Sequence, residues 1–280
     1  MDYRCYSCLA KAFVKLVEKH NLSEDSREDL VKEFFQFMAA TPKEFSAPEV
    51  ARINQHKMCE ILKDKDPYKE IKYLSNKYLL DKYDELRAIV DNSDDKFETA
   101  LRLAISGNII DYAANADFDL DATIKKVLEE EFSIDDSKLL KEKLSKAKNV
   151  LYLGDNAGEI VMDKIFLETL NHPNVCYVVR GAAVINDVTL EDVKQTGIDK
   201  YAKIITNGYD APSTILNKVS EEFMEKYRAA DVIISKGQGN YEGLLNVKDN
   251  RIFFLMMVKC DMVAEKIGST RGGFVVCRNK

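Results

Sequence analysis

The chain has 280 residues, and its 41 basic against 47 acidic side chains give a formal net charge of -6. This length is long for one compact core and comfortable for two lobes. Charges of both signs are interspersed, which argues against a face that binds nucleic acid. No apolar run approaches the roughly 18 residues that span a bilayer, and the first residues lack the apolar core of a secretion signal. We therefore expect a cytoplasmic protein without nucleic-acid or membrane partners.

The first half of the chain has apolar residues at helical spacing. They recur every three or four residues in nearly every segment up to about residue 145, which is typical of amphipathic helices. Polar or Pro-containing stretches separate these segments, as expected at helix ends. We predict a helical lobe over residues 1–147, with helices over residues 10–20, 26–40, 48–63, 67–89 and 97–105.

From residue 148 onward, short apolar runs alternate with helical stretches. Continuous apolar strands that alternate with helices indicate a parallel sheet covered on both faces. We predict strands over residues 149–153, 175–179, 203–206, 231–235, 252–258 and 273–277. We predict helices over residues 159–170, 190–196, 213–228, 241–246 and 261–267. The predicted fold is α/β: a Rossmann-like α/β/α sandwich over residues 148–280, preceded by the helical lobe.

The six cysteines do not form the pattern of a disulfide framework, and free thiols fit a reducing compartment. The spacing Cys5-x-x-Cys8 is that of half a zinc site or of a redox pair. A second half-site is His56-x-x-Cys59, whose side chains would share one helix face. The simpler alternative, which we favour, is that Cys59 is a buried side chain on an apolar helix face.

The first predicted strand after residue 148 leads into a loop, residues 154–158, with an acid, an amide and two glycines. Open α/β sheets bind ligands at the carboxyl ends of their strands. The adjacent side chains of Asp155 and Asn156 can hold a hard divalent cation through their oxygens. The alternative is that one of them only caps the helix that begins at Glu159.

Polar residues also follow the later strands of this half. They are Arg180, Asp187, Lys236, Gly237, Gly239, Asn240 and Lys259. Because the carboxyl ends of parallel strands converge, Asp155, Asn156 and Asp187 can meet around one cation. The two lysines and the N–H groups near the glycines would then face an anion. Two carboxylates and one amide suit Mg²⁺ or Mn²⁺ with open positions for metal-assisted hydrolysis.

Each of these residues also has an ordinary structural interpretation. Arg180 and Lys236 could be solvated charges, and Asp187 could cap the helix that follows Thr189. Gly237 and Gly239 could serve only a turn. The functional interpretation depends on their occurring together at one edge of one sheet.

Six motifs together resemble one known family. They are Cys5-x-x-Cys8, Asp66-Pro67-Tyr68, Gly107-Asn108-x-x-Asp111, Gly154-Asp155-Asn156-x-Gly158-Glu159, Arg180-Gly181 with Asn186-Asp187-x-Thr189, and Lys236-x-x-Gly239-Asn240-x-Glu242. The family is that of the metal-dependent damage-control phosphatases, long catalogued as a domain of unknown function and once labelled acidic-residue methyltransferases. The resemblance covers almost the whole chain, and the Cys pair is similar to that of the stand-alone subfamily.

The resemblance implies hydrolysis of phosphate from small phosphorylated metabolites, including sugar phosphates and damaged metabolites, with one divalent ion such as Mn²⁺, Mg²⁺, Co²⁺ or Ni²⁺. It implies that Asp155, Asn156 and Asp187 hold the metal, and that Asn108 and Asp111 reach the site from the helical lobe. The expected catalytic residues are Asp155, Asn108, Asp111 and Glu159. The expected phosphate-binding residues are Arg180, Lys236, Gly237, Asn240 and Lys259.

Two alternatives come from other functional classes. An S-adenosylmethionine-dependent methyltransferase also begins its cofactor site with a strand and an acidic, glycine-containing loop. However, the second strand ends in Val178-Val179-Arg180, without the acid that commonly binds ribose, and the first loop lacks Gly-x-Gly-x-x-Gly. A non-catalytic protein that binds a metabolite or metal would have similar loops, so turnover is the observation that separates it from an enzyme.

Overall fold

The structure is a computed structural model that describes residues 1–107 and 120–279. The chain forms two compact units, Met1–Lys65 and Asp66–Lys280. The predicted division between residues 147 and 148 follows the change in secondary-structure type, whereas the compact units divide after residue 65. The reason is that helices between residues 69 and 146 bury their apolar faces in the same core as the sheet.

The first unit contains the helices α1 (Tyr3–Lys19), α2 (Glu24–Ala40) and α3 (Ala47–Leu62). Phe13 of α1 and Phe34 of α2 stack with their ring centroids 4.5 Å apart, inside a small apolar core. Helix α3 begins with a capping box, in which Glu49 N–H donates to the hydroxyl of Ser46 and the Glu49 carboxylate accepts from Ser46 N–H at 2.9 Å. These helices thus have a core and caps of their own.

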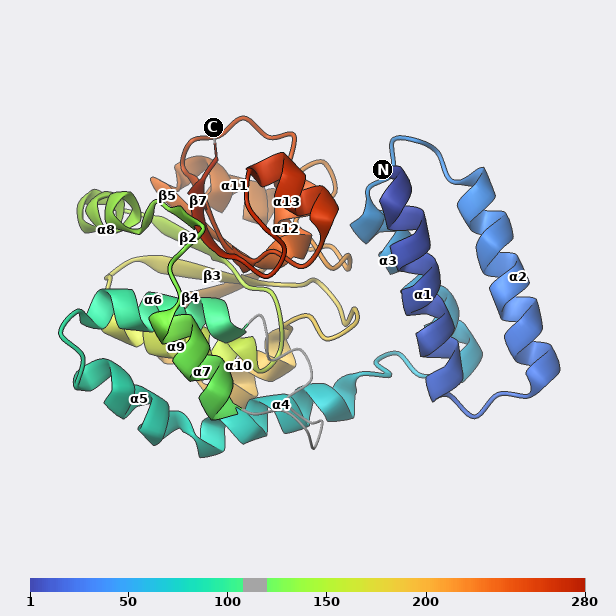
Figure 1. The fold of residues 1–280 in the computed structure, drawn as a ribbon, viewed down its shortest axis with the longest axis horizontal. Helices are drawn as coiled ribbons and strands as arrows, with labels where there is room; N and C mark the ends of the chain where they lie inside the picture. Colours follow the sequence, from blue (N-terminus) through green and yellow to red (C-terminus); the bar gives the residue numbers. More distant parts are fainter. Residues whose placement is uncertain (108–119, 280) are drawn as a thin grey trace. The chain divides into compact units, whose positions relative to one another are not determined.

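The second unit begins with a helical segment that packs on the sheet (Figure 1). Its helices are α4 (Lys69–Asp81), α5 (Tyr83–Asp91), α6 (Lys96–Ser106), α7 (Leu120–Glu129) and α8 (Ser137–Lys146). The single helix predicted over residues 67–89 is two helices, because the backbone at Lys82 leaves the α region with φ -101° and ψ 4°. In the described part of the chain, none of the helices is long and apolar enough to cross a membrane.

Within the described residues, one sheet of seven strands has the order β1-β7-β6-β5-β2-β3-β4. The strands are β1 (Ile134–Asp135), β2 (Val150–Leu153), β3 (Val175–Val179), β4 (Lys203–Thr206), β5 (Val232–Lys236), β6 (Ile252–Met257) and β7 (Phe274–Arg278). The α/β prediction is confirmed. The prediction of an entirely parallel sheet is wrong, because β7 runs antiparallel to β6. In addition, the short strand β1 lies inside the predicted helical lobe.

The remaining helices cover both faces of the sheet, with α9 and α10 on the face opposite to α11, α12 and α13 (Figure 1). Their bounds are α9 (Glu159–Leu170), α10 (Leu190–Thr196), α11 (Glu221–Ala229), α12 (Gly237–Leu244) and α13 (Asp261–Ile267). The helix predicted over residues 213–228 begins later, because Ser220 caps α11 by accepting from Phe223 N–H at 3.2 Å. Residues 213–219 therefore lie in a loop before α11.

The strand order places a topological switch point beside β2. From β2 the chain continues to β3 and β4 on one side and then returns to β5 on the other side. Ligands bind in the crevice at such a point, outside the carboxyl ends of the strands. The loop after β2 and the first turn of α12, which follows β5, both lie at this edge.

Candidate active site

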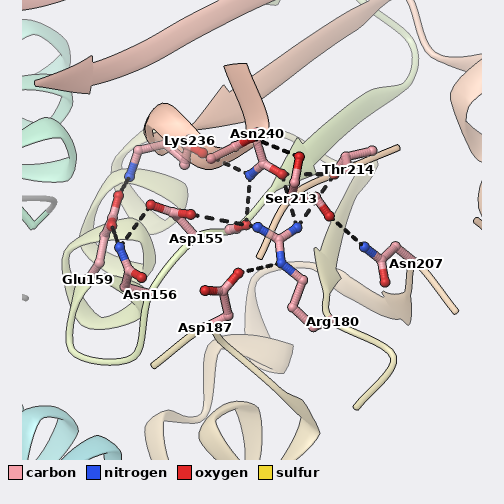
Figure 2. A network of polar contacts seen from close by, with 12 residues as sticks. Asp155, Asn156, Glu159, Arg180, Asp187, Asn207, Ser213, Thr214, Lys236 and Asn240 are labelled. Atoms are coloured by element: carbon pink, nitrogen blue, oxygen red, sulfur yellow. Dashed lines mark hydrogen bonds and ion pairs between the residues drawn. The ribbon is translucent and has the colours of Figure 1, made fainter. Parts of the chain in front are cut away.

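The loop after β2 presents Asp155 and Asn156 at the switch point. The N-cap of α9 is Gly158, whose N–H donates to Asn76 rather than to either of these side chains. The Asn156 amide nitrogen donates to Asp155 Oδ2 at 2.8 Å and to Glu159 Oε2 at 3.3 Å (Figure 2). Its nitrogen is therefore engaged by carboxylates, and its carbonyl oxygen is the group suited to a cation.

Asp187 belongs to a second loop, which is paired with the first. The two backbones pair antiparallel at Asn156 and Asp187, and Val188 N–H donates to the Asp155 carbonyl at 2.8 Å. The N-cap of α10 is Thr189, while the buried Asp187 carboxylate accepts from Arg180 Nε at 2.6 Å. The structure thus brings together Asp155, Asn156 and Asp187, and Asp187 is not the helix cap.

Arg180 lies buried beside these residues at the end of β3. Its Nη1 donates to Asn240 Oδ1 at 2.9 Å, and its Nη2 lies 3.6 Å from Asp155 Oδ1 (Figure 2). Among the described residues, the buried Nη2 has no hydrogen-bond acceptor. A buried donor without an acceptor is costly, so this atom is suited to an oxygen of a bound anion.

Lys236 is the last residue of β5, and the sequence analysis predicts that it faces a bound anion. In the structure its amine instead contacts two carboxylates of α9. Its Nζ donates to Glu159 Oε1 and to Asp163 Oδ1, each at 2.5 Å, and to the Ala104 carbonyl at 2.8 Å. All three charged side chains are fully buried. Burial alone would lower the pKa of Lys236, but the two carboxylates raise it, so the lysine stays charged. Its charge is already neutralised, which corrects the predicted phosphate contact.

Asp163 is a member of this cluster that the sequence analysis missed. It accepts from the hydroxyls of Tyr152 at 2.6 Å and Tyr177 at 2.8 Å. Burial, together with this carboxylate, holds the pKa of both tyrosines well above its usual value, so both stay protonated donors. The sequence did contain a signal for Asp163: it is an acid one turn after Glu159, in a helix that is apolar over most of its length.

Asn240 is also used within the protein. Its Oδ1 accepts from Arg180 and from the Thr214 hydroxyl, and its Nδ2 donates to the carbonyls of Gly154 at 3.1 Å and Lys236 at 2.8 Å. It therefore connects β5 to the loop after β2 and supports Arg180, which corrects its predicted role as a direct phosphate ligand.

The first turn of α12 approaches Asp155 closely through its glycines. A Cβ added at Gly239 would lie 4.0 Å from Asp155 Oδ1 and only 2.3 Å from the Pro212 carbonyl oxygen. Gly237 has φ +74°, which favours glycine. Lys259, after β6, is partly buried and lies close enough to lower the pKa of Asp155. The start of α12 and Lys259 thus place positive charge near Asp155.

Three polar residues of the site were hidden in or near the helix predicted over residues 213–228. Ser213 donates to the Gly239 carbonyl at 2.7 Å, and Thr214 bonds to Asn240. Asn207, at the end of β4, accepts from Gly181 N–H at 3.1 Å and donates to the Ser213 carbonyl (Figure 2). The helix prediction gave no reason to place Ser213 and Thr214 at the sheet edge, whereas Asn207 directly follows the predicted strand 203–206 and could have been found by that position.

The electrostatics of the site favour a cation. Burial, and then the carboxylates of Glu159 and Asp187, hold the pKa of Asp155 well above its usual value, while Arg180 and Lys259 oppose that shift. Within residues 1–107 and 120–279, no three His, Cys, Asp or Glu side chains are grouped to hold a metal by themselves. The donors are instead two carboxylates and an amide, which with this excess of buried negative charge fit a hard divalent ion.

Asn108 and Asp111, the two site residues expected from the helical lobe, lie outside the described residues. Cys5 and Cys8 belong to the first unit, on α1. The site described above is therefore formed entirely by the second unit.

The fold and the site define an open α/β protein with a buried group of acidic and amide side chains at the switch point of its sheet. The chain belongs to the family of the damage-control phosphatase ARMT1-like domain, whose family model matches residues 1–274. It is 34% identical over 285 residues to the damage-control phosphatase PH1575 of Pyrococcus horikoshii, covering 100% of this chain and 98% of that protein. It is 32% identical over 280 residues to a damage-control phosphatase of Archaeoglobus fulgidus, covering 97% and 96%.

A crystal structure has the same fold over the full length. It is that of PH1575 from Pyrococcus horikoshii, described as a DUF89 family protein, with a TM-score of 0.90 and 33% sequence identity. The comparison covers 100% of this chain and 99% of that chain. The family resemblance drawn from the six motifs is confirmed.

Proposed function

We propose that this protein is a divalent-metal-dependent phosphatase that removes phosphate from small phosphorylated metabolites, such as sugar phosphates and damaged metabolites, in the cytoplasm. The names of the similar proteins support a phosphatase rather than a methyltransferase. The observation that carries the proposal is the buried group of Asp155, Asn156 and Asp187 beside Arg180 Nη2, which has no hydrogen-bond acceptor among the described residues.

The proposed metal ligands are the carboxylates of Asp155 and Asp187 and the amide oxygen of Asn156. A bound Mg²⁺, Mn²⁺, Co²⁺ or Ni²⁺ would act there as a Lewis acid toward phosphate and water. Glu159 and Lys236 serve this set indirectly. Because Lys236 holds the Glu159 carboxylate in place, Glu159 orients the Asn156 amide through the bond to its nitrogen.

The proposed phosphate position lies between Arg180, Lys259 and the first turn of α12. Phosphoryl transfer depends mainly on positioning and on neutralising the charge of the phosphoryl oxygens. Arg180 is held at two of its nitrogens by Asp187 and Asn240, so Nη2 is already oriented to donate. The partial positive charge at the start of α12 adds to this field.

Asp155 is also a proposed catalytic residue, and burial together with the carboxylates of Glu159 and Asp187 raises its pKa well above the usual value. The family resemblance adds Asn108 and Asp111 as catalytic residues.

A phosphatase screen tests the proposal. Purified protein is incubated with a panel of sugar phosphates and nucleotides, with each divalent metal and with a chelator, while released phosphate is measured. We expect metal-dependent release from small phosphate monoesters, and none with chelator. No release from any substrate with any metal, together with calorimetric binding of S-adenosylmethionine, would favour the methyltransferase. Metal binding without turnover would favour a binding protein.

A further inference from the structure

Helix α4 forms buried hydrogen bonds to both loops of the proposed metal site. The fully buried Asn76 accepts from Gly158 N–H at 2.5 Å, at the end of the loop that contains Asn156. Its amide nitrogen donates to Asp192 at 2.9 Å and to Gln195 at 2.8 Å, both on α10. One side chain thus bonds to the loop after β2 and to the helix that follows Asp187.

Lys72, one turn earlier on α4, reaches the second loop. Its buried Nζ lies 3.4 Å from the Thr189 hydroxyl and 3.4 Å from Asp192 Oδ2. The same carboxylate oxygen accepts from the N–H and the hydroxyl of Thr189, each at 2.8 Å. Since Thr189 is two residues from Asp187, Lys72 and Asp192 hold the chain where Asp187 leaves its loop.

The Asp66-Pro67-Tyr68 motif has a role in this arrangement. Asp66 accepts from Tyr68 N–H at 3.2 Å, just before α4 begins, and its other carboxylate oxygen lies 3.3 Å from Lys72 Nζ. The motif thus shapes the start of α4 and shares the charge of Lys72. None of these contacts includes a proposed metal or phosphate ligand.

The turn at Gly158 shows why the Asn76 bond matters for geometry. Gly158 has φ +80°, and a Cβ there would lie 3.2 Å from Ser75 Cβ, so α4 packs directly on the turn. The hydrogen bond from Gly158 N–H to Asn76 fixes the direction of this peptide. Asn156 precedes it by two residues, so α4 supports the position of Asn156, whose backbone also pairs directly with that of Asp187.

We infer that Asn76 is a positioning residue for the metal site, and that it forms with Lys72 a brace, the α4 brace, that holds the two paired ligand loops in place from outside. The inference rests on the proposed metal site. Loss of Asn76 leaves all three proposed ligands in place but frees the turn that presents one of them. Binding a cation then requires ordering the loop first, which weakens the affinity.

The test compares Asn76→Ala with the matched control Gln195→Ala. The control removes another hydrogen-bond partner of Asn76, and a bond to the Tyr73 carbonyl, but leaves the bond to Gly158 intact. The dissociation constant of Mn²⁺ is measured by titration calorimetry at 20 °C, and the melting temperature is measured with and without Mn²⁺. We expect Kd to rise about tenfold in Asn76→Ala, equivalent to about 1.4 kcal/mol, and to change less than about twofold in the control.

Several outcomes would separate the possible failures. A folded Asn76→Ala with the wild-type Kd would overturn the brace, as would an equal loss in Gln195→Ala. If Asn76→Ala does not fold, Asn76→Ser takes its place, with the same expected loss and the same criterion. A wild-type protein that binds no Mn²⁺, Mg²⁺, Co²⁺ or Ni²⁺ would instead overturn the proposed metal site and the brace with it. Normal Mn²⁺ binding without turnover would refute only the phosphatase activity.

Discussion

In the metal-free protein, removing the charge of Asp187 should lower the stability of the fold, whereas removing the charge of Asp155 should not. Asp187→Asn weakens a buried ion pair with Arg180, whose Nε lies 2.6 Å from the carboxylate. Removing one partner of such a pair costs about 3 to 5 kcal/mol, and a hydrogen bond to a charged group contributes about 1.5 to 3 kcal/mol. Because the Asn oxygen still accepts, we expect a loss of about 2 to 3 kcal/mol.

Asp155→Asn removes a carboxylate whose charged form is disfavoured by burial and by two neighbouring carboxylates. The raised pKa means that the folded protein binds this proton more tightly than the unfolded chain does. Its effect on stability is therefore unfavourable at pH values above the unfolded pKa, about 3.9. We expect the metal-free Asp155→Asn variant to be at least as stable as the wild type at pH 7.

Thermal melts in chelator and in Mn²⁺ check both expectations. For a domain of about 150 to 250 residues, the loss in Asp187→Asn corresponds to a fall of about 4 to 12 °C in melting temperature. Mn²⁺ at about 100 times its Kd should stabilise the wild type by about 2.7 kcal/mol and both variants by much less. A metal-free Asp187→Asn protein as stable as wild type, or an equal loss in Asp155→Asn, would refute this electrostatic reasoning.

Three further predictions concern Lys236, the Asp249–Arg251 pair and the N-terminal thiols. Lys236→Met leaves two buried carboxylates without their cation, so we expect urea unfolding to show a loss of about 3 to 5 kcal/mol; wild-type stability would contradict the buried cluster. Arg251 lowers the pKa of Asp249 to about 2. The charged Asp249 therefore stabilises the folded protein fully above about pH 4, and this contribution is lost as the pH falls through about 2. Because this pair is partly exposed, Asp249→Asn should cost only about 0.5 to 1 kcal/mol at pH 7 and much less at pH 2. The double variant Cys5→Ser, Cys8→Ser should keep most metal-dependent phosphatase activity, since thiolates do not suit a hard oxygen-donor site; a folded, inactive variant with normal metal content would contradict this.

Local sequence patterns determined much of the α/β part of the molecule. The predicted ranges 159–170, 175–179, 190–196, 203–206 and 261–267 agree with α9, β3, α10, β4 and α13. These segments are apolar runs or amphipathic periods with polar breaks at both ends, so burial and the local breaks favour the same bounds. The loop that carries Asp155 and Asn156 was also predictable, because its position follows from the strand that precedes it.

Long-range packing decided what the sequence could not. Lys236 is the last residue of β5, and only the pairing of β5 with β2 and the position of α9 turn its amine toward Glu159 and Asp163. Asn76 and Gly158 are 82 residues apart in sequence, so neither segment by itself indicates their hydrogen bond. The antiparallel direction of β7 likewise depends on its pairing with another strand, β6. A sequence pattern determines which face of a segment is apolar, but which buried polar groups meet depends on strand order and helix packing, and these exist only in the folded chain.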